Sequence, residues 1–204
     1  FEITGSDLGG RIGKLYTNHG TVSTTAYVPV VHPVRQSIPG SKLREMGFEM
    51  VITNAYIARK RHGEEAVRRG IHDIIGFDGA VMTDSGGYQV LEYGDVEATP
   101  DEIAAFERGI MTDVAIPLDK PTGAGMPRSK AAAYVKHTLE VSKKTLAGAD
   151  DNGQIWVGPV QGGEHLDLVV LPEDEQTQDP EEVDGELGDH NAIEQFHQAP
   201  LTNL

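Results

Sequence analysis

Four short runs of apolar residues recur along the chain and constrain its fold more than any other feature. Their starts lie roughly 30–40 residues apart, which is the size of a strand–helix–strand unit. The runs are apolar throughout and do not alternate with polar residues, which is typical of a parallel sheet covered by helices. They are Glu49–Thr53, Ala80–Thr83, Asp113–Leu118 and Ile155–Val160.

Helical signals fill the intervals between these runs. We expect helices over 42–46, with Ser41 as the cap, and around 63–75, ending near Gly76. Two more are expected from Thr99 to about Gly109 and over 129–146, the latter ended by Gly148. Thr99 is followed by Pro100 and Glu102, which predicts a capping box with proline at the first helical position. This α/β alternation fits both an open doubly wound sheet and a (β/α) barrel, and four strands are half of an eight-stranded barrel.

The chain consists of two segments that differ in net charge. Residues up to Lys144 hold all 17 Lys and Arg and 18 Asp and Glu, a formal charge of −1. The last 60 residues hold 14 acidic residues and no Lys or Arg, a charge of −14. We therefore expect a folded domain over 1–170 and a disordered acidic tail over 171–204. The near-neutral first segment leaves nucleic acid open as a partner, which a uniformly acidic chain would disfavour.

Several classes of protein are excluded or disfavoured by composition. The chain has no cysteine, so it has no disulfide, no thiolate nucleophile and no cysteine-bound metal. No apolar run approaches the length of a membrane span, and the first residues do not resemble a secretory signal, so a cytoplasmic location is expected. The eight histidines form no recognised metal-binding spacing, and no metal site is assigned.

Polar residues follow three of the predicted strands directly. Asp84 and Ser85 follow the second strand, Asp119 follows the third, and Gln161 and Gly162 follow the fourth. The carboxyl ends of parallel strands meet at one edge, where functional groups collect in both candidate architectures. Each residue also has a structural interpretation, as a helix cap, a loop acid or a turn.

Taken together, these side chains favour a flat heterocycle as the ligand. Carboxylates accept hydrogen bonds from ring and amino N–H groups, and a carboxamide both donates and accepts. Tyr88, four residues after Asp84, is a candidate for stacking on the ring, with a core aromatic as the alternative. Guanine fits this set of groups, because it offers an N–H donor edge and a carbonyl acceptor.

Three motifs resemble the tRNA-guanine transglycosylases, and the second is similar to the archaeal, archaeosine-forming branch. They are residues 83–89 (Thr-Asp-Ser-Gly-Gly-Tyr-Gln), 117–122 (Pro-Leu-Asp-Lys-Pro-Thr) and 160–163 (Val-Gln-Gly-Gly). The resemblance extends over about residues 5–168. It implies a TIM-type (β/α) barrel, here partial, and a pentosyltransferase that exchanges a D-arm guanine of tRNA for 7-cyano-7-deazaguanine. It thereby implies tRNA and both bases as partners, and it allows a homodimer.

The resemblance also implies roles for the residues at the strand ends. Asp84 would be the acid/base group that handles the ring proton of the leaving and entering bases, and Ser85 would line that site. Tyr88 would stack on the base. Asp119 would bind the donor edge of guanine. Gln161 with Gly162 would bind its carbonyl side.

Two parts of the family pattern are missing from this sequence. The resemblance implies an aspartate nucleophile on a later barrel strand. The most similar residues here are 187–189 (Leu-Gly-Asp), and no predicted strand precedes them. The family also binds zinc through three cysteines and a histidine in a region that this chain lacks. We expect the chain to be a fragment, a frame-disrupted product or a gene remnant. A non-catalytic base-binding or RNA-binding subunit is the alternative function.

Overall fold

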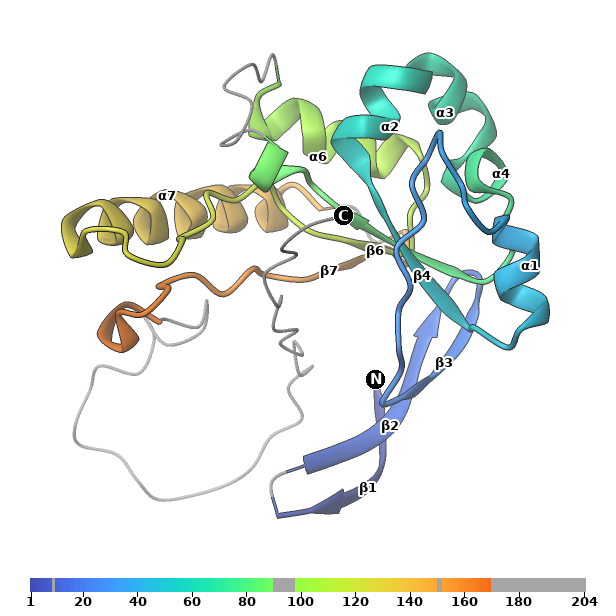
Figure 1. The fold of residues 1–204 in the computed structure, drawn as a ribbon, viewed down its shortest axis with the longest axis horizontal. Coiled ribbons are helices and arrows are strands. Elements are labelled where there is room, and N and C mark those ends of the chain that lie inside the picture. Colours follow the sequence, from blue (N-terminus) through green and yellow to red (C-terminus); the bar gives the residue numbers. More distant parts are fainter. Residues whose placement is uncertain (9, 90–97, 150–151, 170–204) are drawn as a thin grey trace.

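The protein is described by a computed structural model, which covers residues 1–8, 10–89, 98–149 and 152–169. The chain begins with a three-stranded antiparallel sheet in the order β1-β2-β3, at the bottom of Figure 1. Its strands are β1 (Glu2–Asp7), β2 (Gly10–Thr17) and β3 (Gly20–Thr24). The sequence patterns described above did not predict this sheet.

The four apolar runs form a parallel sheet, which confirms the α/β class. The strands are β4 (Met50–Asn54), β5 (Ala80–Asp84), β6 (Val114–Ala115) and β7 (Ile155–Trp156). They pair in parallel in the order in which they occur along the chain. A doubly wound sheet reverses its strand order at a switch point, and these four strands contain no reversal. Sequential order is the arrangement expected for a segment of a barrel.

The last two strands are shorter than the sequence predicted. We expected Asp113–Leu118 and Ile155–Val160, and each observed strand has two residues. Pro117 and Pro159 lie within the predicted runs and have no N–H to donate, which limits how far each strand can extend. The edge of the sheet beyond β4 is extended by a parallel bridge between Val30 and Ile52.

Helices connect the strands. They are α1 (Gly40–Glu45), α2 (Ala55–His62), α3 (Glu64–Arg69), α4 (Ile71–Ile75), α6 (Pro100–Gly109), α7 (Arg128–Ala147) and the 3₁₀ helix η1 (Leu166–Leu168). Of these, α2, α3, α4 and α6 lie above the parallel sheet in Figure 1. None of the helices in the described part of the chain combines the length and hydrophobicity needed to cross a bilayer.

The region predicted as one helix around 63–75 is two short helices, α3 and α4, and a further helix that was not predicted, α2, precedes them. Gly63 and Gly70 separate α2, α3 and α4, with φ of +48° and +82°. These positive values interrupt the helical path, and glycine adopts them without the steric cost of a Cβ. Gly76 ends α4 in the left-handed conformation, as the sequence indicated.

The capping signals at the start of α6 are confirmed in detail. The Thr99 hydroxyl accepts a hydrogen bond from the Glu102 N–H, and the Glu102 carboxylate accepts one from the Thr99 N–H. Pro100 occupies the first helical turn. The end of α7 at Gly148 is also confirmed. The predicted Ser41 cap is wrong, because Pro39 is the capping residue of α1 and no side chain caps that helix.

Two hydrophobic clusters cover the two faces of the parallel sheet. One packs residues of β4 and β5 against α2, α3, α4 and α6, and includes Ile71, Phe77 and Ile110. The other joins Met82 and other residues of β4, β5 and β6 to Val22 of β3. Val22 is 1% exposed, although most of its sheet faces solvent. The antiparallel sheet therefore packs on the face of the parallel sheet opposite the helices.

Candidate functional site

The predicted site residues lie at the carboxyl ends of β5, β6 and β7. Asp84 is the last residue of β5, and Asp119 and Gln161 lie in the loops that follow β6 and β7. The Gln161 side-chain Nε2 donates a hydrogen bond of 2.5 Å to Oδ2 of Asp119. Asp84 is near enough for its charge to raise the pKa of Asp119. The structure thus brings all three side chains together at one edge of the sheet.

Asp84 is held in place by its neighbours at the end of β4. Its carboxylate accepts hydrogen bonds from Asn54 Nδ2 at 3.0 Å and from the Gly86 N–H at 3.2 Å. Burial raises the pKa of Asp84, and these two hydrogen bonds partly oppose that effect. The hydrogen bond from Gly86 closes a turn at the end of β5, which is the structural role that the sequence allowed for Asp84. Asp84 therefore both shapes its loop and faces the site.

Asn54 is a site residue that the sequence analysis missed. It pairs with Asp84 in the register of β4 and β5, and its Nδ2 also donates to Gln89 Oε1 at 3.1 Å. Its Oδ1 caps α2 by accepting a hydrogen bond from the Ile57 N–H. The cap fixes the amide orientation, so that the NH₂ group faces Asp84. A polar residue at the end of the first predicted strand was the signal that would have found it.

The pKa of Asp119 is clearly raised. Burial raises the pKa of Asp119 from its usual 3.8 to about 6, with a further contribution from the negative charge of Asp84. The hydrogen bond from Gln161 opposes the shift. At neutral pH the group is a carboxylate, and a modest fall in pH protonates it.

Gln161 is oriented by the loop that follows β6. Its Oε1 accepts hydrogen bonds from the Thr122 N–H at 2.8 Å and from the Thr122 hydroxyl at 3.0 Å. The amide NH₂ group is consequently directed toward Asp119. The Thr122 hydroxyl also accepts a hydrogen bond from the Gly162 N–H at 2.9 Å. Thr122 is therefore a further positioning residue, and it lies within the second family motif.

The paired glycines after Asp84 allow two parts of the site to approach each other. A Cβ at position 87 would lie 2.2 Å from Asp119 Oδ1, and one at position 86 would lie 2.5 Å from Tyr56 Cβ. Both contacts are far too short for any side chain. Two glycines at a strand–loop joint can let a ligand approach the backbone closely, whereas in the structure Gly87 admits the carboxylate of Asp119.

Ser85 and Tyr88 differ sharply in their exposure. Ser85 is fully buried, and its hydroxyl has no hydrogen-bond partner among the described residues. An unpaired buried hydroxyl carries a free-energy cost that a polar ligand would relieve. Tyr88 is 57% exposed, so its interpretation as a core aromatic is wrong.

A buried acid lies directly behind the site. Glu107 of α6 is completely buried, and its Oε1 accepts a hydrogen bond of 2.8 Å from the Thr83 hydroxyl. Burial raises the pKa of Glu107 well above its usual range, and the charge of Asp84 raises it further. A neutral Glu107 avoids a second buried charge behind Asp84. No sequence signal pointed to this residue beyond its place on an amphipathic helix.

The cysteine-bound zinc of the resemblance cannot be built from this chain. It requires thiolate ligands, and the 204 residues include no cysteine. The described residues are accordingly assigned no part in holding that ion. The partial match to the nucleophile motif lies at residues 187–189, within the predicted tail over 171–204. Both ranges are outside the described residues.

A parallel α/β sheet that ends in two carboxyl groups and an oriented carboxamide defines a protein with a polar ligand site at that edge. Sequence comparison gives the family. The chain belongs to the queuine tRNA-ribosyltransferase family, whose sequence model matches residues 7–176. This finding confirms the resemblance that the three motifs indicated.

Similar proteins come from several archaea, and their names agree. A tRNA-guanine(15) transglycosylase of Aeropyrum pernix is 46% identical over 169 residues, which are 83% of this chain and 33% of that protein. Proteins of the same name are 43% identical in Haloferax volcanii and 40% identical in Sulfolobus acidocaldarius, over 82% and 83% of this chain. The chain spans about a third of the length of these relatives.

Proposed function

We propose that this chain forms the base-recognition part of an archaeal-type tRNA-guanine transglycosylase. In this proposal it binds guanine and 7-cyano-7-deazaguanine at the carboxyl ends of β5, β6 and β7, during exchange of a D-arm guanine of tRNA. The observation that carries the proposal is the contact between Asp119 and Gln161, with Asp84 beside them. Family membership and the names of the archaeal relatives support it.

The donor and acceptor groups of the site complement the edge of guanine. The Asp119 carboxylate accepts from the ring and amino N–H groups of the base. Gln161 uses one amide proton on Asp119 and retains a second for the carbonyl oxygen. Gly162 follows Gln161, and its N–H, which donates to the Thr122 hydroxyl in this structure, would donate to the base instead when the base is bound. Ser85 lines the site and Tyr88 stacks on the ring.

Asp84 is proposed to move the ring proton of the departing and entering bases. Because burial raises its pKa, its protonated and charged forms are closer in free energy than those of an exposed aspartate. Departure of guanine from the ribose requires protonation of the base, and attack by the entering base requires loss of a proton. One carboxyl group can serve both steps in turn.

The complete exchange also needs a nucleophile that forms a covalent ribosyl intermediate. In the double displacement that the family resemblance implies, a carboxylate attacks the anomeric carbon and expels guanine, and the second base then displaces the carboxylate. We assign no described residue to this role. The activity proposed for the chain itself is therefore base binding and proton transfer, with transfer to tRNA dependent on a complete catalytic site.

The test of base recognition compares two aspartate variants. Calorimetric titration of the intact chain with guanine and with 7-cyano-7-deazaguanine should show binding to the parent protein. Asp119→Ala should lose it, because the acceptor for the donor edge is gone. Asp78→Ala is the matched control, since Asp78 is exposed and pairs with Arg44. Equal affinity in the parent and Asp119→Ala would refute the assigned role.

A second experiment separates the catalytic proposal from its alternatives. Incorporation of labelled guanine into tRNA would demonstrate exchange by this chain. Binding of the base without incorporation would support the non-catalytic subunit, and absence of a cooperative unfolding transition would support a gene remnant. We also propose a cytoplasmic location and a homodimer. The mass of the protein in solution tests the homodimer.

A further inference from the structure

We propose that His19, His72 and Asp113 form a binding site for a divalent first-row transition metal such as Zn²⁺. The three residues come from separate parts of the fold. His19 lies in the turn between β2 and β3, His72 lies on α4, and Asp113 directly precedes β6. Asp113 is at the amino end of its strand, so this cluster lies at the opposite end of the sheet from Asp84 and Asp119.

The distances within the cluster match those between neighbouring ligands of a single ion. His19 Nδ1 is 2.9 Å from Asp113 Oδ1, and His72 Nε2 is 2.8 Å from Asp113 Oδ2. All the ligand atoms lie within 4.8 Å of one another. Nitrogen and oxygen ligands about 2.1 Å from a metal are about 3 Å apart at right angles and about 3.4 Å apart at the tetrahedral angle, so an octahedral site fits these distances directly and a tetrahedral zinc site fits after a small opening of the cluster. Small ring rotations would direct both nitrogens to one point in front of the carboxylate.

The carboxylate is fixed by groups that would remain in place when a metal binds. Asp113 is 1% exposed. Its Oδ2 accepts a hydrogen bond from the Val81 N–H at 2.8 Å, and its Oδ1 accepts one from the His19 N–H at 3.1 Å. Backbone donors of this kind orient metal-ligating carboxylates in known sites. Each oxygen keeps its remaining lone pair on the side of the two imidazoles.

The donor set selects the class of ion. Two imidazole nitrogens and one carboxylate suit zinc, cobalt and nickel, whereas calcium and magnesium prefer oxygen ligands throughout. The two rings are stacked with their centroids 3.6 Å apart, so that both nitrogens face the same carboxylate. Neutral imidazoles with one carboxylate leave a single negative charge, which a dication complements. Water would complete the coordination.

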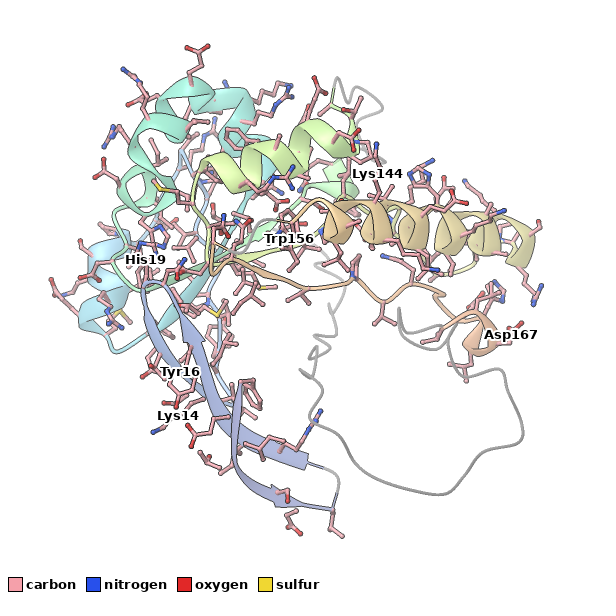
Figure 2. All side chains as sticks on the ribbon, turned by 180° about the vertical axis from the view of Figure 1, so that it is seen from behind. Lys14, Tyr16, His19, Lys144, Trp156 and Asp167 are labelled. Atoms are coloured by element: carbon pink, nitrogen blue, oxygen red, sulfur yellow. The ribbon has the colours of Figure 1, made fainter. Side chains whose placement is uncertain are left out.

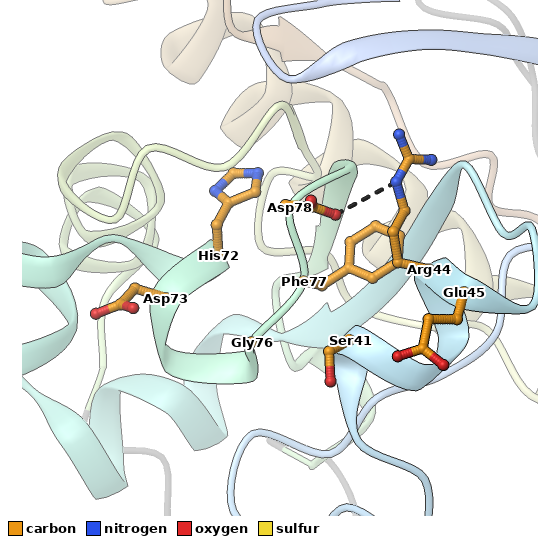
Figure 3. Close-up of a pocket in the computed structure, with 8 residues that line it drawn as sticks. All are labelled: Ser41, Arg44, Glu45, His72, Asp73, Gly76, Phe77 and Asp78. Atoms are coloured by element: carbon orange, nitrogen blue, oxygen red, sulfur yellow. Dashed lines mark ion pairs between the residues drawn. The ribbon is translucent and has the colours of Figure 1, made fainter.

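An ion has a route to this cluster from solvent. The His19 side chain is 38% exposed, and Figure 2 shows it at the tip of the β2–β3 turn against the parallel sheet. His72 borders an open cavity of about 600 Å³. The cavity is also lined by Glu45, Asp73 and Asp78, with Arg44 as the opposing charge (Figure 3). Each of these three carboxylates is already in an ion pair, with Lys42, Arg69 and Arg44 respectively, so the cavity offers access without a surplus of unpaired carboxylates.

A bound ion would add a direct link between three parts of the fold. It would tie the turn of the antiparallel sheet to α4 and to the start of β6. A ligand that binds only the folded state raises stability according to its concentration relative to its Kd. We therefore expect zinc to raise the Tm of this chain, independently of any base or tRNA.

The test is metal binding to the tag-free chain, measured by calorimetry with Zn²⁺ and by visible absorption with Co²⁺. The parent protein should bind one ion at this site and gain Tm with zinc. His19→Ala and His72→Ala should each weaken binding by at least about 10-fold and lose the gain in Tm. His137→Ala on α7 is the matched control and should behave as the parent.

A conservative variant distinguishes metal binding from a purely hydrogen-bonded cluster. His19→Gln can still donate to Asp113 and should fold, but its amide is a poor ligand for zinc. Circular dichroism confirms that each variant is folded before titration. The proposal is overturned if the parent binds no ion, or if folded His19→Gln and His72→Ala retain its affinity. Guanine titration of the same variants shows whether base binding is unaffected.

Discussion

At the scale of single residues, the protonation of Asp119 governs the proposed recognition of the base. Burial and the charge of Asp84 raise its pKa to about 6. The protonated group loses acceptor capacity toward the donor edge of guanine. Its carboxylate form, which predominates at neutral pH, is the form that the proposed contact needs.

Guanine affinity should therefore increase as the pH rises from 5 to 7, with the steepest change near the pKa of Asp119. Titration calorimetry over this range measures the effect. Asp119→Asn cannot ionise, so any residual binding by this variant should depend much less on pH. A parent affinity that stays constant, or falls as the pH rises, would contradict the prediction.

The same pKa predicts how Asp119 affects stability. Its native pKa is raised from 3.8 to about 6, so the folded state binds the proton more tightly than the unfolded state. Stability contributed by this group is present at low pH and falls as the pH rises through that interval, by on the order of 3 kcal/mol. Asp119→Asn should consequently be more stable than the parent at pH 7.5.

Urea unfolding at pH 4 and pH 7.5 tests this expectation. The difference in unfolding free energy between Asp119→Asn and the parent should shrink at pH 4, where the parent group is protonated. The amide introduced by Asp119→Asn retains an oxygen that accepts from Gln161, so the substitution removes little beyond the charge. The same difference at both pH values would show that ionisation of Asp119 does not affect stability.

At the scale of elements, the capping box stabilises the start of α6. Thr99→Ala removes the acceptor for the Glu102 N–H and should lower the free energy of unfolding by about 1 kcal/mol. Ser129→Ala is the control, because Ser129 is exposed near the start of α7, where no side chain caps the helix. Urea denaturation of both variants provides the measurement, and equal losses would rule out a specific cap.

The sequence predicted those elements whose signals are local. The capping box of α6, the end of α7 at Gly148 and the four parallel strands could be located from residue patterns alone. The sheet of β1–β3 could not, because β1 is almost entirely exposed and has no apolar face to reveal it. The division of the expected helix into α3 and α4, and its separation from α2, depend on positive φ angles at Gly70 and Gly63, which the sequence permits without requiring.

The site was predictable to a similar extent. Asp84, Asp119 and Gln161 were found because the ends of parallel strands meet at one edge. Asn54 and Thr122 orient those residues through contacts between segments that are distant in the sequence, and composition does not show such contacts. Glu107 was missed because burial of its charge depends on how α6 packs against β5.

At the scale of the whole molecule, Val22 connects the two sheets. It is 1% exposed and packs with Met82 and other residues of the parallel sheet, although it belongs to the antiparallel one. Val22→Ala should lower the free energy of unfolding by roughly 1–3 kcal/mol, through lost burial and the cavity left behind. Val67→Ala is the control, because Val67 is 43% exposed on α3.

Thermal unfolding followed by two probes tests whether the sheets form one cooperative unit. Far-ultraviolet circular dichroism reports on the whole chain, and the fluorescence of Trp156 reports on β7. In Val22→Ala both transitions should shift together to lower temperature. Separate transitions would mean that the antiparallel sheet unfolds on its own.

Gly87, in the segment after β5, closely approaches Asp119, in the loop after β6. A Cβ on one residue would overlap the carboxylate of the other, so neither position can be exchanged without regard to its neighbour. In a library that randomises position 87, selection for a folded pocket should return glycine while Asp119 is kept. A shorter side chain at position 119 should not be enough to admit a larger residue, because a Cβ at position 87 would also lie 2.8 Å from the Asp119 carbonyl oxygen.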